Sequence, residues 1–146
     1  MTDILKRCGR ECRVYGLRRD ITDDVVNGNL RFRPFSEAGF IDDLRTAAGV
    51  VASAGFTLMG EAVYLHRPML AVPIAGQFEQ VLNARYLERE GYGLAADEIS
   101  DERLGQFIER LPDFERSLAR YEQDGNRDLL ACLEKTLEAA AHGKRE

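Results

Sequence analysis

The run V-V-A-S-A-G-F-T-L-M-G-E, residues 50–61, decides the fold. Residues 49–52 form a short apolar run, which predicts a buried strand. The small residues Ser53, Ala54 and Gly55 predict a tight turn after it. Residues 57–65 are then expected to form a helix. A buried strand that turns directly into a helix is the unit from which open α/β sheets are built.

Strands and helices alternate in the same way on both sides of this unit. We expect strands at residues 12–17, 29–32, 49–52, 69–73 and 92–96, and helices at residues 4–12, 35–48, 57–65, 77–90, 100–110, 112–122 and 127–141. Strands that are apolar throughout and alternate with helices are typical of a parallel sheet covered on both faces. The sequence therefore predicts an α/β fold with a doubly wound, Rossmann-like parallel sheet and a helical C-terminal tail.

The length of 146 residues fits one domain, because neither an internal repeat nor a long linker divides the chain. Only three residues precede the first predicted helix, whereas a Rossmann-like half-domain usually opens with a strand. We therefore expect the sheet to lack its first strand or to borrow one. Residues 1–146 are interpreted as a single domain that is a fragment or one chain of a split enzyme.

Composition excludes several classes of protein. With 45% hydrophobic and 31% charged residues, the chain is neither a disordered nor a collagen-like sequence. It has no apolar run of the roughly 18 to 20 residues that a membrane-spanning helix needs, and its start lacks the apolar stretch of a secretory signal. Three cysteines without a C-x-x-C pair favour reduced thiols and disfavour zinc. These features predict a cytoplasmic protein.

Charge is unevenly distributed along the chain. The net charge is -5, yet residues 1–33 hold eight Lys or Arg against five Asp or Glu. The acidic total disfavours nucleic acid as a partner. The basic N-terminal part is more typical of a solvated helix face, although a phosphate-bearing ligand or peripheral association with an anionic membrane remains an alternative.

The start of the helix after residue 55 is a candidate anion site. Its free N–H groups and the positive end of the helix dipole favour a phosphate or diphosphate, and Thr57 is a candidate cap. Glu61 lies four residues beyond Thr57, about one helical turn, so both lie on the same face. A carboxylate at that place can accept hydrogen bonds from the two vicinal hydroxyls of a ribose.

Four segments together resemble a known family. They are S-A-G-F-T-L-M-G-E, R-P-M-L-A-V-P, E-Q-V-L-N-A and G-Y-G, which begin at residues 53, 67, 79 and 91. They resemble the donor-binding C-terminal half of GT-B glycosyltransferases, in particular the UDP-glycosyltransferases with their H-C-G-W-N-S-x-x-E signature and the MurG-like N-acetylglucosaminyltransferases. The signature's Gly and Glu are six apart, as Gly55 and Glu61 are here, and Gln80 precedes Asn83 by three, as in the family. The likeness covers roughly residues 12–95.

The resemblance implies a role for each matching residue. The diphosphate would be held by Ser53, Gly55, Phe56 and Thr57, the ribose by Glu61, the donor sugar by Gln77, Glu79 and Gln80, and the base by Pro34 and Phe35, with Asn83 supporting the loop. Two positions depart from the signature: Ser53 replaces its His, and Leu58 its Ser. The segment between Pro73 and the E-Q pair is two residues longer than in the signature, so the assignment among the three sugar-binding candidates stays open.

By this resemblance the chain binds a UDP-sugar donor, needs neither metal nor cofactor, and belongs to an enzyme that transfers a hexosyl group to an unknown acceptor. The acceptor's base would come from the family's N-terminal domain, so no catalytic residue is assigned here and the isolated chain is expected to be inactive. The alternative is a non-catalytic donor-binding subunit that docks to a separate acceptor-binding chain.

A hydrolase is the main rival enzyme. Residues 51–55, V-A-S-A-G, nearly match the G-x-S-x-G nucleophile elbow, but Val51 stands where the first Gly belongs. The only histidines, His66 and His142, are poorly placed for a Ser-His-acid triad. Asp pairs at 23–24 and 42–43 lack the clustered partners of a metal site. The motifs G-x-x-x-x-G-K-[ST] and G-x-G-x-x-G are also missing, which disfavours a P-loop NTPase and an ordinary NAD-binding domain.

Overall fold

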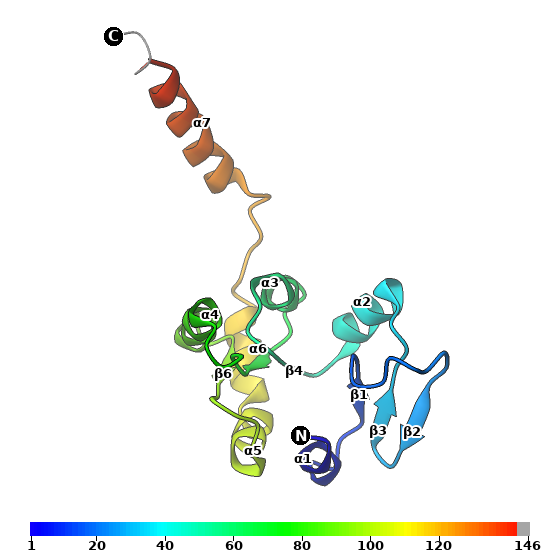
Figure 1. Ribbon diagram of the computed structural model, residues 1–146. Coiled ribbons are helices and arrows are strands. Elements are labelled where there is room, and N and C mark those ends of the chain that lie inside the picture. The colour runs from blue at the N-terminus through cyan, green and yellow to red at the C-terminus, as the bar shows by residue number, and fades with distance from the viewer. Residues whose placement is uncertain (143–146) are drawn as a thin grey trace.

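The computed structural model describes residues 1–142, and residues 143–146 of the predicted tail lie outside the described part. Thirteen elements follow one another along it (Figure 1): α1 (Thr2–Arg7), β1 (Cys12–Val14), β2 (Val25–Asn27), β3 (Leu30–Phe32), α2 (Glu37–Thr46), β4 (Val50–Ala52), α3 (Phe56–Tyr64), β5 (Met69–Ala71), α4 (Phe78–Arg89), β6 (Gly93–Ala95), α5 (Asp101–Glu109), α6 (Leu111–Leu118) and α7 (Arg127–His142). All the predicted helices and strands are present, with ends that differ by a few residues.

The strands form two sheets of three strands, in the orders β1-β3-β2 and β4-β5-β6. Every pair is parallel except β2 with β3. The α/β fold with parallel strands is confirmed, but the single sheet is divided between β1 and β4. The strand β2, a hairpin partner of β3, was not predicted from the sequence. Val26 is exposed, so β2 lacks the apolar pattern of a buried strand, although the two-residue loop Gly28-Asn29 that follows it is a hairpin signal.

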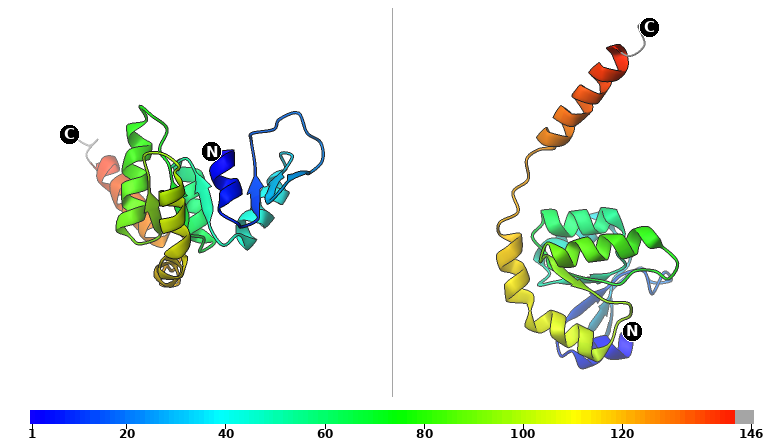
Figure 2. Two further views of the ribbon diagram at one scale, coloured as in Figure 1. Left: turned by 90° about the horizontal axis from the view of Figure 1, so that it is seen from below. Right: turned by 90° about the vertical axis from the view of Figure 1, so that its left-hand side faces the viewer.

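Helices cover both faces of the strands (Figure 2). One core joins α1, α5 and α6 to residues of both sheets, among them Leu5, Val14, Leu30, Leu70 and Phe107. A second core packs α3 and α4 against the opposite face of β4, β5 and β6. Over the first sheet α2 lies on that same side, with the Phe40 ring against Tyr15 at a centroid distance of 5.1 Å. This is the layering of a doubly wound fold.

Serine caps fix the starts of two helices. The Ser36 hydroxyl accepts from Gly39 N at 3.2 Å and so starts α2, and Ser100 accepts from Arg103 N at 3.1 Å and starts α5. A side-chain oxygen that takes one of the free N–H groups of the first turn holds the helix end in place. The helix predicted over residues 35–48 therefore begins only after its capping serine.

The C-terminal helix α7 stands away from the body of the domain, beyond the connecting residues 119–126 (Figures 1 and 2). It is amphipathic in sequence, yet its leucines are half or more exposed: Leu129, Leu130, Leu133 and Leu137. Across residues 1–142, no helix combines the length and apolar character that crossing a bilayer requires.

Candidate functional site

The loop from β4 to α3 leaves backbone donors open. Gly55 is the N-cap of α3, no side chain caps it, and the first intrahelical bond runs from Met59 N to Gly55 O at 3.1 Å. The N–H groups of Phe56, Thr57 and Leu58 therefore have no intrahelical acceptor, as in the first turn of any helix. Because the dipole also makes this end positive, the loop can accept an anion.

The surroundings of Gly55 keep this helix start accessible. A Cβ at Gly55 would meet no atom within 4 Å, so the space beside the N-cap on that side is open, and Gly55 itself is half-buried. Ala54 beside it is fully buried against the second core, which anchors the loop, whereas the Phe56 side chain is 70% exposed. The helix begins one residue earlier than predicted. Thr57 is consequently the second helical residue, and the expectation that it caps the helix is wrong.

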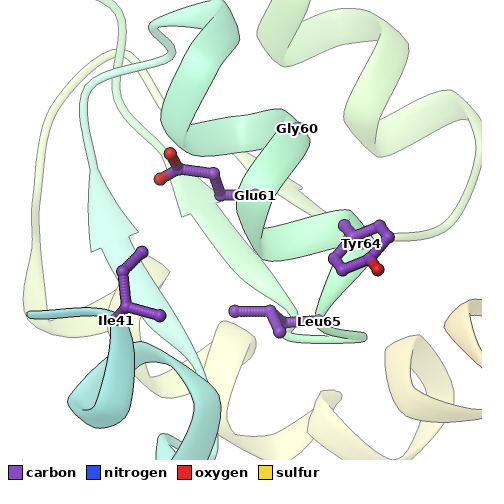
Figure 3. Close-up of a pocket in the computed structure, with 5 residues that line it drawn as sticks. All are labelled: Ile41, Gly60, Glu61, Tyr64 and Leu65. Atoms are coloured by element: carbon purple, nitrogen blue, oxygen red, sulfur yellow. The ribbon is translucent and has the colours of Figure 1, made fainter. Parts of the chain in front are cut away.

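Glu61 lies one turn further along α3, on the wall of a shallow pocket of about 390 Å³. The pocket lies between α2 and α3 and is lined by Ile41, Gly60, Glu61, Tyr64 and Leu65 (Figure 3). The Glu61 carboxylate points away from the Tyr64 ring in this view. Across the described residues it has no hydrogen-bond or ion-pair partner, so its oxygens are available to a ligand.

The loop after β5 lies beside the β4–α3 loop. Val72 N donates to Ala52 O at 2.9 Å, so the two parallel strands end at the same edge of their sheet and their loops leave it together. The Asn83 Nδ2 atom on α4 donates to Ala54 O at 3.1 Å and joins that helix to the β4–α3 loop. The candidate diphosphate and sugar residues are thus brought to one edge of the second sheet.

The three sugar-binding candidates differ in what they contact. Gln80 is 9% exposed, and its Oε1 accepts from Ile74 N at 3.0 Å while its Nε2 donates to Gln77 Oε1 at 2.7 Å. Gln80 therefore closes the loop between β5 and α4, and Gln77 is the N-cap residue of α4. Glu79 is exposed in the first turn, without a partner among the described residues.

The two base-contact candidates lie after β3, in the first sheet. Phe35 is 90% exposed, and no ring contact of its side chain occurs in residues 1–142. The neighbouring Arg33 is held by Asp24 at 3.0 Å and Asp43 at 3.1 Å. Asp43 also accepts from the Tyr15 hydroxyl at 2.5 Å, and burial together with this bond raises the pKa of Tyr15. Within residues 1–142, no hydrogen bond, ion pair or ring contact joins the side chains of Pro34 and Phe35 to the other site residues.

Two features near the candidate site were not predicted from the sequence: a pair of exposed apolar side chains, and the ion pairs of Arg33 with two aspartates. Ile74 and Phe78 flank the loop after β5 and are 49% and 77% exposed. Their position beside the E-Q pair was the available signal, because an apolar patch next to polar candidate residues is typical of a binding site, whereas single exposed apolar side chains are ordinary. Asp24, Arg33 and Asp43 lie nine and ten residues apart on different elements, so no helix or strand spacing relates them.

The geometry does not favour the hydrolase site considered from the sequence. Ser53 is exposed at the start of the loop, whereas His66 lies beyond the opposite end of α3 and packs its ring against Tyr121 at 6.2 Å. Nine residues of helix separate the two, about 13 Å of rise, so His66 cannot serve Ser53 as a base. In the described part of the chain, no three His, Cys, Asp or Glu side chains cluster as metal ligands.

Comparison with known sequences identifies relatives. The family model described as glycosyl transferase family 1 matches residues 1–112. The UDP-N-acetylglucosamine–N-acetylmuramyl-(pentapeptide) pyrophosphoryl-undecaprenol N-acetylglucosamine transferase 1 of Bacillus thuringiensis (strain Al Hakam) is 35% identical over 88 residues, 57% of this chain and 24% of the relative. The corresponding transferase of Geobacillus thermodenitrificans (strain NG80-2) is 36% identical over 90 residues, 58% of this chain and 25% of the relative.

Solved structures share the fold. The spinosyn forosaminyltransferase SpnP superposes with a TM-score of 0.60 and 18% identity, over 73% of this chain and 28% of that one. The glycotransferase of kitacinnamycin gives a TM-score of 0.55 and 22% identity, over 85% and 32% of the two chains. Both neighbours have the GT-B architecture. The chain matches only about a quarter to a third of the length of these relatives.

Proposed function

The chain belongs to glycosyl transferase family 1, and from this premise we propose that it forms the UDP-sugar-binding domain of an enzyme that transfers a hexosyl group to an acceptor. The observation that carries this proposal is the uncapped start of α3, with Glu61 unpaired one turn away. A nucleoside diphosphate carries a diphosphate and a ribose diol next to each other, which is the pair of groups that these two features suit.

The N–H groups at the start of α3 would act on the leaving group. When the bond between sugar and diphosphate breaks, negative charge gathers on the diphosphate oxygens. Donors that are already oriented stabilise this charge without rearranging during the reaction. We therefore propose that Gly55, Phe56 and Thr57, together with Ser53, bind the diphosphate and that transfer does not depend on a metal ion.

The remaining residues have separate proposed roles. Glu61 accepts from the ribose hydroxyls, and Gln77 and Glu79 contact the donor sugar, since their side chains lie at the start of α4. Gln80 acts through the loop that it closes, and Asn83 supports the β4–α3 loop. Pro34 and Phe35 contact the base. The preference for UDP rests on the relatives, whose names specify UDP-N-acetylglucosamine.

A second candidate function is a donor-binding subunit that is inactive without a separate acceptor-binding chain. This alternative is kept because every role proposed above for the described residues concerns the donor and none concerns an acceptor. Such a subunit would bind the donor with full affinity but transfer sugar only when its partner is added. The free thiols fit a cytoplasmic location. Peripheral association with a membrane would then come through the partner chain.

Calorimetric titration with UDP, UDP-N-acetylglucosamine, GDP and TDP in the presence of EDTA tests the proposal. We expect UDP and its sugar to bind at least tenfold more tightly than GDP and TDP, because the base contacts favour uracil. Equal affinity for all three bases would contradict the assignment of UDP. No binding of any nucleotide would contradict the proposed function of the domain.

A further inference from the structure

Cys8 and Cys12 bring their sulfur atoms together where α1 passes into β1. Cys8 is the C-cap residue of α1, Cys12 is the first residue of β1, and their Sγ atoms lie 3.7 Å apart. A disulfide bond is about 2.05 Å long, so less than about 2 Å of closer approach between the two sulfurs would form one. Neither residue is among the candidate donor-binding residues, so the proposed function leaves this pair of thiols unused.

The backbone on both sides of the pair is held without help from the sulfurs. Leu5 is 8% exposed and anchors α1 in the first core, next to β1 (Figures 1 and 2). Cys12 N donates to Asn29 O at 2.9 Å, which ties the start of β1 to the first sheet. The Asn29 side chain also donates from Nδ2 to Leu5 O at 2.9 Å and to Arg10 O at 2.7 Å. The two thiols therefore stay adjacent whether or not they are bonded to each other.

The turn between the two cysteines depends on Gly9. Its φ of +69° lies in the left-handed region, which glycine adopts without strain. Beyond this turn both sulfurs approach the same carbonyl oxygen, that of Arg10, at 3.9 Å from Cys8 Sγ and 3.5 Å from Cys12 Sγ. The short loop of residues 8–12 thus directs both thiols to one place.

The pair is within reach of a small reagent. Cys8 and Cys12 are half-buried against the first core, and the remaining cysteine, Cys132, is exposed on α7. Lys6 and Arg10 beside the pair are exposed, and across residues 1–142 no ion pair engages their side chains. Free positive charges attract anionic molecules, among them the disulfide form of a peptide thiol such as glutathione.

We propose that Cys8 and Cys12 are a reversible disulfide site, which low-molecular-weight disulfides oxidise and which then links α1 covalently to β1. Two adjacent thiols that are held in place favour an internal disulfide over a lasting bond to the reagent, because the second exchange step is intramolecular. In a reducing compartment such a bond is transient. This inference does not depend on the proposed function.

The reaction consists of two exchange steps. The Cys8 thiolate attacks one sulfur of the reagent, forms a mixed disulfide and displaces one reagent thiolate. The Cys12 thiolate then attacks Cys8 Sγ and displaces the second. The two cysteines are oxidised, and the reagent is reduced to two thiols that take up the two protons. Burial and the neighbouring Cys8 raise the pKa of the Cys12 thiol to about 12, which makes Cys8 the first to attack.

Intact-mass spectrometry of the native full chain with Cys132→Ser tests the proposal, with oxidised glutathione as the probe. The substitution removes the exposed thiol, which would otherwise form its own glutathione adduct. We expect the mass to fall by two hydrogens, about 2 Da, with no bound glutathione, because Cys12 displaces it from Cys8. Peptide mapping should then find residues 8 and 12 linked, and dithiothreitol should restore the starting mass.

A second variant separates a paired site from two independent thiols. Cys12→Ala, in the same Cys132→Ser background, removes the displacing thiol, so Cys8 should keep its glutathione. Cys8→Ala replaces it as the control if Cys12→Ala fails to fold, and Cys12 should then carry the adduct. Stable glutathione adducts on the Cys132→Ser protein without the 8–12 linkage overturn the proposal. An unchanged mass of the native protein, when the same protein reacts in urea, overturns it as well.

Discussion

Asn83 on α4 and Ala54 in the β4–α3 loop are joined by a hydrogen bond of 3.1 Å from the Asn83 amide to the Ala54 carbonyl oxygen. Ala54 itself is fully buried, so the bond fixes the backbone directly before the N-cap of α3. Through this contact, α4 sets the direction in which the first N–H groups of α3 point. The position of the candidate anion site thus depends on a residue that need not touch the ligand.

Asn83→Ala should lower the free energy of unfolding by about 1 kcal/mol, because one hydrogen bond is lost and the carbonyl of Ala54 stays partly buried. We also expect UDP to bind at least threefold more weakly, since the loop is no longer held. Chemical denaturation and calorimetry measure the two effects. Glu88→Gln, on an exposed position of the same helix, is the control and should change neither. Unchanged UDP affinity with reduced stability would show that Asn83 serves the fold alone.

Glu61→Gln should weaken UDP binding by roughly 1 to 3 kcal/mol, because charged hydrogen bonds to the ribose are replaced by neutral ones. The sharper test uses 2′,3′-dideoxy-UDP, which lacks both hydroxyls. Wild type and Glu61→Gln should bind this analogue with the same affinity, as measured by calorimetry. If the substitution lowered the affinity for UDP and for 2′,3′-dideoxy-UDP by the same factor, Glu61 would not bind the ribose hydroxyls.

Glu79→Gln is the matched variant for that experiment. Its carboxylate lies at the exposed start of α4, so the substitution should reduce the affinity for UDP-N-acetylglucosamine by about fivefold and leave UDP unchanged. The two variants thereby separate ribose binding from sugar binding. Weaker binding of UDP to Glu79→Gln would contradict the proposed division of roles.

The unit from β4 to α3 could be predicted from sequence because its signals are local. An apolar strand, three small residues and a helix follow one another without interruption, and spacing alone places Glu61 one turn from the helix start. The helix begins one residue earlier than predicted because Gly55, which has no side chain to cap with, is nevertheless the N-cap. Propensity favours Thr as a cap, but Thr57 lies within the first turn of α3.

The inward direction of Gln80 was not predicted, although the sequence contains the signal. Gln80, Ala84 and Leu87 are the buried residues of α4, and their spacing of four and three residues marks one helical face. The resemblance to the family assigned Gln80 to the donor sugar, and in the structure its side chain closes the loop between β5 and α4. The division of the sheet between β1 and β4 could not be predicted from local patterns, because strand pairing joins segments that are distant in sequence.

Stability at alkaline pH should depend on Cys12. Its Sγ lies 3.7 Å from that of Cys8, and burial together with this neighbour raises the pKa of the Cys12 thiol from 9.0 to about 12. Because the pKa of the Cys12 thiol is higher in the folded than in the unfolded chain, its contribution to stability is complete below pH 9 and is lost as the pH rises toward 12. The free energy of unfolding of wild type should therefore fall between pH 9 and 12 more steeply than that of Cys12→Ala. Parallel curves, obtained by urea denaturation under reducing conditions, would rule out this linkage.

Gly55→Asp should separate stability from ligand binding. The N-cap has φ −66° and ψ 134°, which any residue can adopt, and a Cβ there meets no neighbour. Asp is a better N-cap than Gly by a few tenths of a kcal/mol, because its carboxylate accepts from the N–H groups that follow. The same carboxylate would occupy and repel an anion site, so UDP affinity should fall more than tenfold while the melting temperature holds or rises. Gly55→Asn, a neutral cap of the same size, should gain similar stability with a smaller loss of affinity. Full UDP affinity in the Asp variant would show that the diphosphate does not bind at the start of α3.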